Sequence, residues 1–129
     1  MEYNFPEDLL YDSENNWVKI QGEFAVIGIT EFAVKKAKEI AYIELPKKGK
    51  KFKKGETYSM IEAVKWAGQL KIPLSCEIIE VNENLLDDPT ILNNDPYGKG
   101  WIAKIKILKK EEVSELMDSE KAKKFFKEK

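Results

Sequence analysis

Short β-prone segments, separated by turn residues, follow one another along most of this chain. Residues 17–20 and 24–29 flank a turn that contains Gly22, and residues 101–108, WIAKIKIL, alternate apolar and lysine side chains. A period of two is typical of strands that bury one face. On this pattern one face of the last segment carries Trp101, Ala103, Ile105 and Ile107. Strands as short as these bury that face by packing together as sheets.

Two further strands are predicted on either side of Lys65. TYSMIEAV, residues 57–64, precedes it, and QLKIPLSCEIIEVN, residues 69–82, follows it. Pro73 lacks the amide hydrogen that a sheet ladder needs, so the second strand should lie at an edge or be bulged or interrupted there. If that strand is unbroken, one of its faces carries Leu70, Ile72, Leu74, Cys76 and Ile78.

A short helix is predicted in the first half of the chain. Residues 30–41, TEFAVKKAKEIA, begin with Thr30 as a candidate N-cap and Glu31 at the positive end of the helix dipole. Its apolar side chains near one face are Phe32, Ala33, Ala37 and Ile40. A strand is predicted to follow and to end at Pro46.

The second half carries the remaining helical segments. The turn-rich residues 83–100 are predicted to hold one or two helical turns around Leu85 and Ile91, and residues 110–129 are predicted to be helical, with acidic residues first and lysines last. The side chains expected to pack this end on the body are Val113, Leu116, Met117 and Phe125. The whole pattern predicts one domain, residues 1–129, that is mainly β: a small β-sandwich or flattened barrel with a short internal helix and a C-terminal helix.

The residue types that are missing limit the chemistry. The chain has no histidine, and its single cysteine is Cys76. Histidine is the most frequent general base and transition-metal ligand, and thiolate-rich zinc or iron–sulfur sites need several cysteines. We therefore expect a protein that is not itself an enzyme and that has no metal site.

Charge and composition make nucleic acid and membranes poor partners. The formal net charge is −1, and all 22 basic residues are lysines, so the arginine fork that reads phosphate and guanine is missing. The acidic N-terminus, MEYNFPEDLLYDSENN, lacks the pattern of a signal peptide, and one cysteine cannot form an internal disulfide. We expect a cytoplasmic monomer.

Lys65 stands between two predicted strands, in IEAVKWAGQL, where a hairpin tip would expose its amine. Two paired strands hold such a tip in place, and the small residues Ala63, Ala67 and Gly68 lie close by. A prosthetic group attached there would have a long arm on a rigid base, with the cofactor supplying the chemistry. From these residues alone, the alternative is an ordinary surface lysine in a turn.

A second group of lysines fills the loop at residues 47–54, within PKKGKKFKKGE. Gly49 and Gly55 predict turns there. The loop is either a solvated surface segment or a docking patch for an acidic partner.

Three long segments resemble one known family. They are GITEFAVKKAKEIAYIELPKKG, EAVKWAGQLKIPLSCEIIEVNENL and NNDPYGKGWIAKIKI, in this order. From residue 17 to residue 126 the chain is similar to the H-protein of the glycine cleavage system. IEAVK followed by P-x-S-x-E-I-x-E-V-N is one specific part of the match, and NDPYGKGW is another. The resemblance implies a lipoyl/biotinyl-like β-sandwich with a C-terminal helix.

The resemblance also implies that Lys65 carries lipoate, covalently attached in amide linkage. Glu62 matches the acidic residue often found three positions before the modified lysine. Biotin carriers usually place their lysine between methionines, whereas Val64 and Trp66 flank Lys65, so lipoate is preferred.

In the family that the chain resembles, the carrier serves several enzymes. Glycine decarboxylase loads an aminomethyl group, aminomethyltransferase removes it with tetrahydrofolate, and dihydrolipoamide dehydrogenase reoxidises the dithiol. The lipoyl sulfurs form a two-electron couple, so one arm moves carbon and electrons. A lipoate ligase or octanoyltransferase is the implied modifying enzyme.

The chain departs from the family pattern at four places. Trp66 replaces a small residue, Cys76 replaces a glycine, the loop at residues 47–54 is more basic, and the usual histidine near Trp17 is missing. Trp66 either lies against the dithiolane or only packs the hairpin. Cys76 either exchanges with the lipoyl disulfide or is a buried thiol.

These departures keep other functions open. One is an H-protein-like lipoate-binding protein that serves another oxidoreductase, such as heterodisulfide-reductase-like sulfur oxidation. Another is a lipoate relay that stores the group for other lipoyl domains. A third, from a different class, is an unmodified binding module with an incidental lysine.

Overall fold

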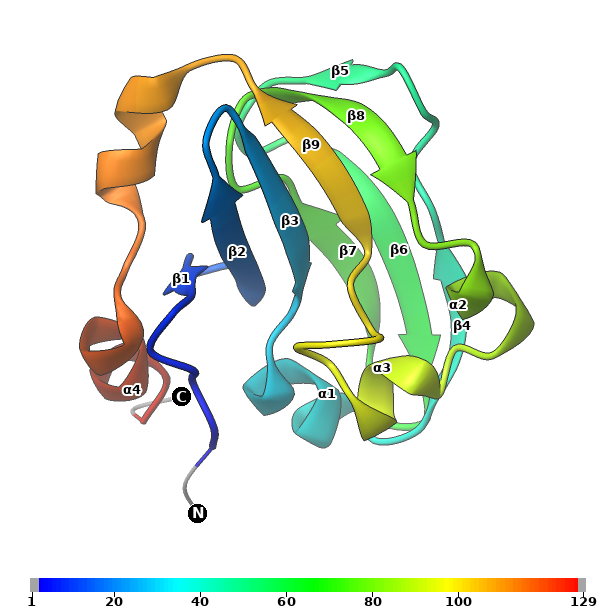
Figure 1. Cartoon of the computed structure of the whole chain (residues 1–129). Coiled ribbons are helices and arrows are strands. Elements are labelled where there is room, and N and C mark those ends of the chain that lie inside the picture. The colour runs from blue at the N-terminus through cyan, green and yellow to red at the C-terminus, as the bar shows by residue number, and fades with distance from the viewer. Residues whose placement is uncertain (1–2, 128–129) are drawn as a thin grey trace.

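Two antiparallel sheets face each other in the computed structural model, which describes residues 3–127. The six-stranded sheet has the order β1-β2-β3-β9-β8-β5, and the three-stranded sheet has the order β4-β6-β7. The first sheet comprises β1 (Leu10–Tyr11), β2 (Asn16–Gln21), β3 (Phe24–Ile29), β9 (Ala103–Ile107), β8 (Cys76–Val81) and β5 (Lys51–Phe52). The second comprises β4 (Ile40–Glu44), β6 (Thr57–Ala63) and β7 (Ala67–Lys71). Figure 1 shows the sheets layered, with the β6–β7 hairpin turning near α1 and α3 and β5 at the opposite end. The predicted mainly β sandwich is confirmed.

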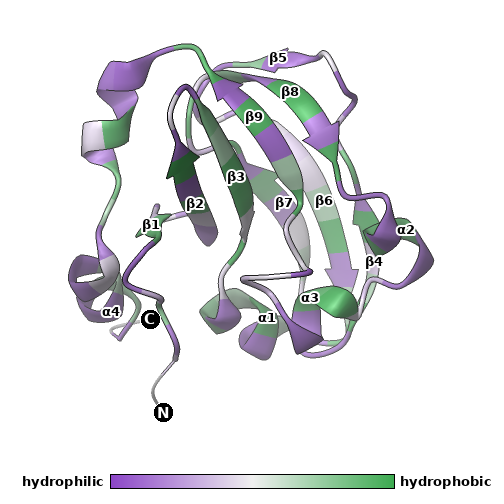
Figure 2. Cartoon of the chain, viewed as in Figure 1, coloured by the Kyte–Doolittle hydropathy of each residue, from purple (hydrophilic) through white to green (hydrophobic). Residues whose placement is uncertain are grey.

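The main core fills the space between the sheets. Its fully buried side chains come from both, and include Ile27, Ile43, Ile61, Leu70, Ile78 and Ile105. Figure 2 shows hydrophobic and hydrophilic residues alternating along β9, as expected for a strand with one buried face. The β2–β3 hairpin is confirmed, with Gly22 at a φ of 66° in its turn.

The first helix is shorter than predicted. α1 spans Glu31–Ala37, and Thr30 caps it as expected, because its Oγ1 accepts a hydrogen bond from the Ala33 amide at 3.2 Å. The helix ends at Lys38, and Ile40, which was expected on the helix, begins β4 and pairs with Ala63. Sheet pairing therefore overrides the helical pattern at residues 38–41.

Pro73 interrupts the strand predicted at residues 69–82. The chain leaves the three-stranded sheet after β7 and enters the six-stranded sheet at β8. The five side chains expected on one face are all buried, because the segment crosses the core between the sheets: Leu70, Ile72, Leu74, Cys76 and Ile78.

Helical turns occur where the turn-rich segment predicted them, at α2 (Asn84–Asp87) and α3 (Ile91–Asn94). The alternation of WIAKIKIL holds from Ala103 onward. Trp101 precedes β9, is half-buried, and packs on the second cluster described below, so its expected place on the core face is wrong; Ile102 is buried in the main core instead.

The C-terminal segment is two pieces rather than one helix. A 3-10 helix, η1 (Lys110–Glu115), is followed by α4 (Ser119–Lys127). Between them Met117 pairs with Tyr11 through two backbone hydrogen bonds of 2.7 and 2.8 Å, which hold that part of the chain extended. The last two residues of the predicted helical segment, 128–129, lie outside the described residues.

α4 closes a second, aromatic cluster beside the sandwich. Its buried members are Phe5, Leu9, Tyr11, Trp17, Phe32, Ala122 and Phe126. The four side chains expected to pack at this end do so while half-buried: Val113 and Leu116 on the main core, Met117 and Phe125 on this cluster. Within residues 3–127 no helix has the length and apolar character needed to cross a bilayer.

Candidate functional site

Lys65 lies at the tip of the β6–β7 hairpin, as predicted. The register pairs Glu62 with Ala67, and the Ala63 amide donates to the Trp66 carbonyl at 2.9 Å, which leaves Val64 and Lys65 beyond the ladder. Lys65 is exposed, and 66% of Val64 is exposed. The amine therefore stands on a paired base and is open to an approaching enzyme.

The backbone of this tip is anchored from outside the hairpin. The Lys65 amide donates to the Ala37 carbonyl at 2.8 Å, and the Val64 amide donates to the Glu39 carbonyl at 3.1 Å. Two-residue hairpin loops usually need positive φ angles. Among residues 3–127, the non-glycine residues with positive φ are Asn15 and Lys38, so this tip has a different geometry and relies on the α1–β4 junction.

Asn93 of α3 fixes that junction. Its Oδ1 accepts from the Ile40 amide at 2.9 Å, and its Nδ2 donates to the Lys38 carbonyl at 2.8 Å. One amide side chain thus holds the peptide groups on both sides of Glu39. The Glu39 carbonyl in turn accepts the hydrogen bond of the Val64 amide at the hairpin tip. Sequence reasoning missed Asn93, because the segment around it predicted a helical turn near Ile91, turn residues and a match to a family, but no long-range contact of this side chain.

Lys38 is strained at the same junction. Its φ of 69° and ψ of −152° lie in a region that glycine adopts readily and other residues adopt at a cost of about 1–3 kcal/mol. The sequence offers no sign of this strain, since a lysine after a helix is unremarkable. The surrounding hydrogen bonds hold Lys38 in this conformation.

The NDPYGKGW segment, residues 94–101, connects α3 to neighbouring elements through hydrogen bonds. The Asp95 carboxylate accepts from the Lys99 amide at 2.8 Å, and the Trp17 indole donates to the Pro96 carbonyl at 2.9 Å. The Tyr97 hydroxyl accepts a hydrogen bond of 3.0 Å from the Glu31 amide, at the start of α1. This segment therefore ties α3 to β2 and α1, and so places Asn93.

The residues that flank Lys65 differ in environment. Glu62 is exposed and pairs across the sheet with Tyr42 and Ala67. Trp66 is half-buried, packs against the main core, and lies so close over Gly68 that a Cβ there would stand 2.5 Å from the indole. Trp66 thus packs the hairpin, which is one of its two predicted roles; a contact with a dithiolane stays a prediction.

Cys76 is remote from the tip. It is 0% exposed in β8, where it pairs with Phe52 and Ile107. Burial, with a smaller effect of the Glu112 carboxylate, raises the pKa of the Cys76 thiol to about 12. A buried, protonated thiol is a poor nucleophile, so this environment favours the buried-thiol interpretation over disulfide exchange.

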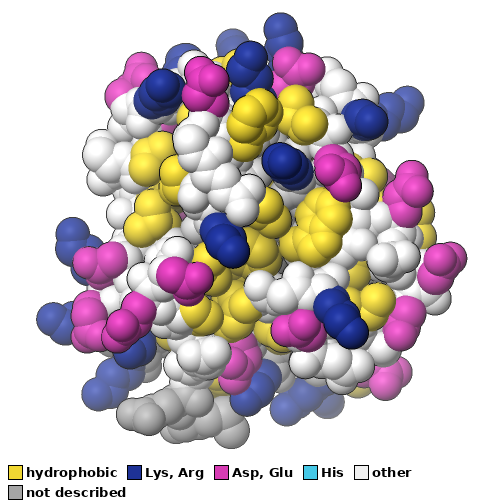
Figure 3. All heavy atoms as spheres, viewed as in Figure 1, with side chains coloured by type: hydrophobic (Ala, Val, Ile, Leu, Met, Phe, Trp, Pro, Cys, Tyr) yellow, Lys and Arg dark blue, Asp and Glu magenta, His cyan; other side chains and the backbone are white. Residues whose placement is uncertain are grey.

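The basic loop also lies away from Lys65. It contains β5, which Figure 1 places at the end of the molecule opposite the hairpin tip, and Figure 3 shows lysine side chains along that upper edge. Lys54 of this loop pairs with Glu115, and the Lys50 amine lies 4.9 Å from the centre of the Phe52 ring. In the described part of the chain, no group of three or more potential metal ligands comes together.

A sandwich of two small sheets with an exposed lysine at a hairpin tip defines the lipoyl-domain-like class of β-sandwich proteins. Comparison with known proteins narrows this class. The family model of the glycine cleavage H-protein matches residues 9–129.

Individual relatives agree with the family model. The chain is 47% identical over 128 residues to a probable glycine cleavage system H protein of Pyrococcus abyssi, covering 98% of this chain and 95% of the relative. It is 41% identical over 123 residues to the glycine cleavage system H protein of Carboxydothermus hydrogenoformans, covering 95% of each. The crystal structure of a glycine cleavage system H protein from Mycobacterium marinum superposes with a TM-score of 0.83 at 30% identity, covering 91% of this chain and 94% of that one.

The chain belongs to the glycine cleavage H-protein family. Proteins of this family are lipoyl carrier subunits and not catalytic enzymes, which confirms the expectation drawn from the missing histidine.

Proposed function

We propose that this protein is a lipoyl carrier of the glycine cleavage system and that Lys65 bears lipoate in amide linkage. The observation that carries the proposal is the exposed Lys65 amine at a hairpin tip whose backbone is bonded to Ala37 and Glu39. Membership of the H-protein family supports the same function. A swinging arm needs a fixed base and a free end, and the tip offers both.

The residues present fit this group. The Lys65 amine would hold it, with Glu62, Val64 and Trp66 beside the attachment point and the anchored backbone keeping the base in place. When bound, lipoate supplies a dithiolane that carries an aminomethyl group and two electrons. The chain itself contributes presentation and no catalytic group, so the catalytic groups belong to the partner enzymes.

The partners that follow are the enzymes of the same system. Glycine decarboxylase would load the arm, aminomethyltransferase would unload it, and dihydrolipoamide dehydrogenase would reoxidise it. A lipoate ligase or octanoyltransferase would attach the group to Lys65. Each of these must reach the same end of the molecule, which α1, α3 and the hairpin tip form (Figure 1).

Intact-mass analysis of the protein from its own cells, with fragmentation, tests the attachment. We expect one lipoyl adduct on Lys65, its loss in Lys65→Arg, and its retention in Lys47→Arg, a matched lysine change in the basic loop. An unmodified Lys65, in cells that lipoylate their other carriers, would contradict the proposal.

Glycine-dependent carboxyl exchange with glycine decarboxylase then tests the pathway. Fully lipoylated protein should support the exchange, and Lys65→Arg should not. If the lipoylated protein fails here but reacts with sulfur compounds, the alternative oxidoreductase function replaces this one. The geometry gives that alternative less support, since Cys76 and the basic loop, two of the departures behind it, do not adjoin Lys65.

A further inference from the structure

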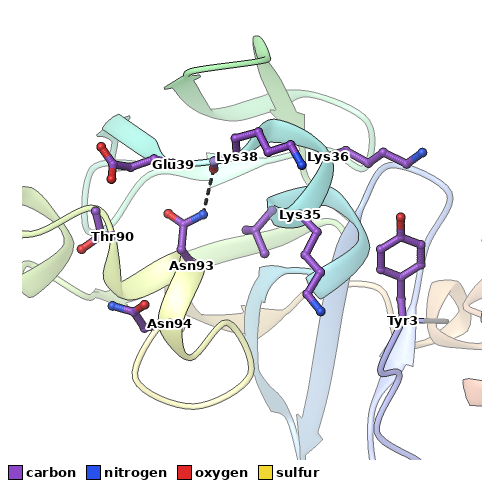
Figure 4. Close-up of a pocket in the computed structure, with 9 residues that line it drawn as sticks. Tyr3, Lys35, Lys36, Lys38, Glu39, Thr90, Asn93 and Asn94 are labelled. Atoms are coloured by element: carbon purple, nitrogen blue, oxygen red, sulfur yellow. Dashed lines mark hydrogen bonds between the residues drawn. The ribbon is translucent and has the colours of Figure 1, made fainter. Parts of the chain in front are cut away.

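A cleft of about 710 Å³ opens between α1 and α3, beside the hairpin tip. Lysines from α1 and its C-terminal end lie on one side, and the amides of Asn93 and Asn94 lie on the other (Figure 4). The cleft and the tip share one stretch of backbone. Lys38 lines the cleft, and its two neighbours, Ala37 and Glu39, accept the hydrogen bonds of the Lys65 and Val64 amides.

The cleft carries uncompensated positive charge. Lys35 pairs with Glu31 at 2.7 Å, but within residues 3–127 no carboxylate forms an ion pair with Lys36 or Lys38. Both of these lysines are exposed. Glu39 is the acidic residue of the lining, and Figure 4 shows its carboxylate directed away from the lysines. The Lys36 amine lies 5.4 Å from the centre of the Phe32 ring, and the exposed Lys38 has the second charge that no carboxylate of residues 3–127 pairs with. Two positive charges without an acidic partner in this part of the chain therefore stand at a hollow next to the proposed attachment point.

Position 38 has a lysine although its backbone conformation disfavours any side chain. Its φ of 69° and ψ of −152° suit glycine, so a side chain here lowers the stability of the fold. The macrodipole of α1 favours the lysines of its last turn, Lys35 and Lys36, but does not require a side chain at the strained position beyond it. Strain of this kind gathers at functional sites, which singles out the charge of Lys38.

We propose that the α1–α3 cleft is a docking site for an acidic surface segment of the enzyme that loads the arm, with Lys38 and Lys36 as its charged contacts. The proposal deepens the proposed function and rests on it, since the loading enzyme is then glycine decarboxylase. Opposite charge attracts the partner and fixes its register. Docking here also aligns the tip, because Lys38 and Glu39 line the cleft within the same stretch, residues 37–39, that anchors the tip.

The test uses fully lipoylated protein as the substrate of glycine decarboxylase from the same organism. Lys38→Gln and Lys36→Gln should each raise the KM for the carrier several-fold with kcat nearly unchanged, and the double variant should flatten the dependence of KM on salt. Lys38→Gly should raise KM as Lys38→Gln does, yet raise the melting temperature by several degrees, because glycine relieves the strain. A higher KM together with a higher melting temperature would show that Lys38 acts in docking and not in stabilising the fold.

A matched control changes charge at the far end. Lys47→Gln and Lys48→Gln, in the exposed loop after β4, should leave KM and its salt dependence unchanged. If the wild-type carrier is a substrate and Lys36→Gln and Lys38→Gln match it, the docking site is wrong while the carrier function stands. If the wild-type lipoylated protein is not a substrate, both proposals fall. Equal effects of the loop variants would show a general charge effect and would also overturn the site.

Discussion

At the scale of single residues, the side chain next to Lys65 packs over a glycine two positions further along the same arm of the hairpin. The Trp66 indole occupies the space over Gly68 that a Cβ would fill, with 2.5 Å to the nearest ring atom. The half-buried indole then covers part of the main core. A tryptophan directly after Lys65 is accommodated because position 68 is glycine.

This pairing predicts that Gly68→Ala lowers the free energy of unfolding by about 1–3 kcal/mol, because the new methyl group displaces the indole. In a Trp66→Ala background the same change should be neutral or slightly stabilising, since alanine restricts the unfolded chain. Urea denaturation of the four proteins measures the difference. An equal loss in both backgrounds would show that the indole is not the clashing group.

The Cys76 thiol predicts a pH dependence. Burial raises its pKa from 9.0 to about 12, so the folded state keeps a proton that the unfolded state loses. Stability should therefore fall as pH rises above 9.0, by up to about 1.4 kcal/mol per pH unit from this group. Denaturation of wild type and Cys76→Ala between pH 8.5 and about 10 tests this.

The comparison for Cys76→Ala is the slope of stability against pH, because the smaller side chain leaves a cavity and lowers stability at every pH. Its slope should be flatter than that of the wild type. The buried Tyr11 and Tyr58 and the half-buried Tyr97 also have raised pKa values, mainly through burial, but their effect lowers the stability of the protein only at higher pH. Identical slopes would contradict the assignment to Cys76.

At the scale of elements, α1, α3, β4 and the β6–β7 hairpin meet in one junction held by backbone and amide hydrogen bonds. Asn93 bonds the Lys38 carbonyl and the Ile40 amide, and the carbonyls of Ala37 and Glu39 bond the hairpin tip. Short helices such as α3 gain little stability from their own few hydrogen bonds. Here α3 acts as a support for one side chain.

Asn93→Ala should therefore cost about 1–3 kcal/mol of unfolding free energy, because the buried Ile40 amide loses its partner. Amide hydrogen exchange at Val64 and Lys65 should become faster in the folded protein. Asn94→Ala, an exposed asparagine of the same helix, is the matched control and should change neither. Unchanged exchange at the tip in Asn93→Ala would show that the hairpin holds itself.

At the scale of the whole molecule, the aromatic cluster joins the two ends of the described chain to the sandwich. Phe126 of α4 stacks on Phe5 with ring centres 5.5 Å apart and lies 4.8 Å from Phe32 of α1. Ser119 at the start of α4 donates to the Phe5 carbonyl at 2.6 Å. The C-terminal helix is thus part of the folded body.

Phe126→Ala should cost about 3–5 kcal/mol of unfolding free energy, since the side chain is 3% exposed and leaves a cavity. Phe125→Ala removes a half-buried neighbour from the same helix and should cost clearly less. Thermal or urea denaturation measures both. Equal losses would mean that α4 packs by bulk hydrophobicity and not through the Phe5–Phe32–Phe126 contacts.

The sequence by itself determined the local structure and the class of protein. The period of two in residues 103–107, the turn at Gly22 and the cap at Thr30 act between near neighbours, so their outcomes can be read without knowing the fold. The missing histidine excluded the commonest catalytic arrangements, and the long match from residue 17 to residue 126 indicated the family.

The tertiary structure decided what depends on residues far apart in the chain. Residues 38–41 leave the helix because Ile40 pairs with Ala63 and bonds Asn93, and the C-terminal helix breaks where Met117 pairs with Tyr11. The anchoring of Lys65 to α1, and the strain at Lys38 beside it, arise in the same way. No local pattern encodes contacts between residues so far apart in the chain, because each contact appears only once the sheets have packed.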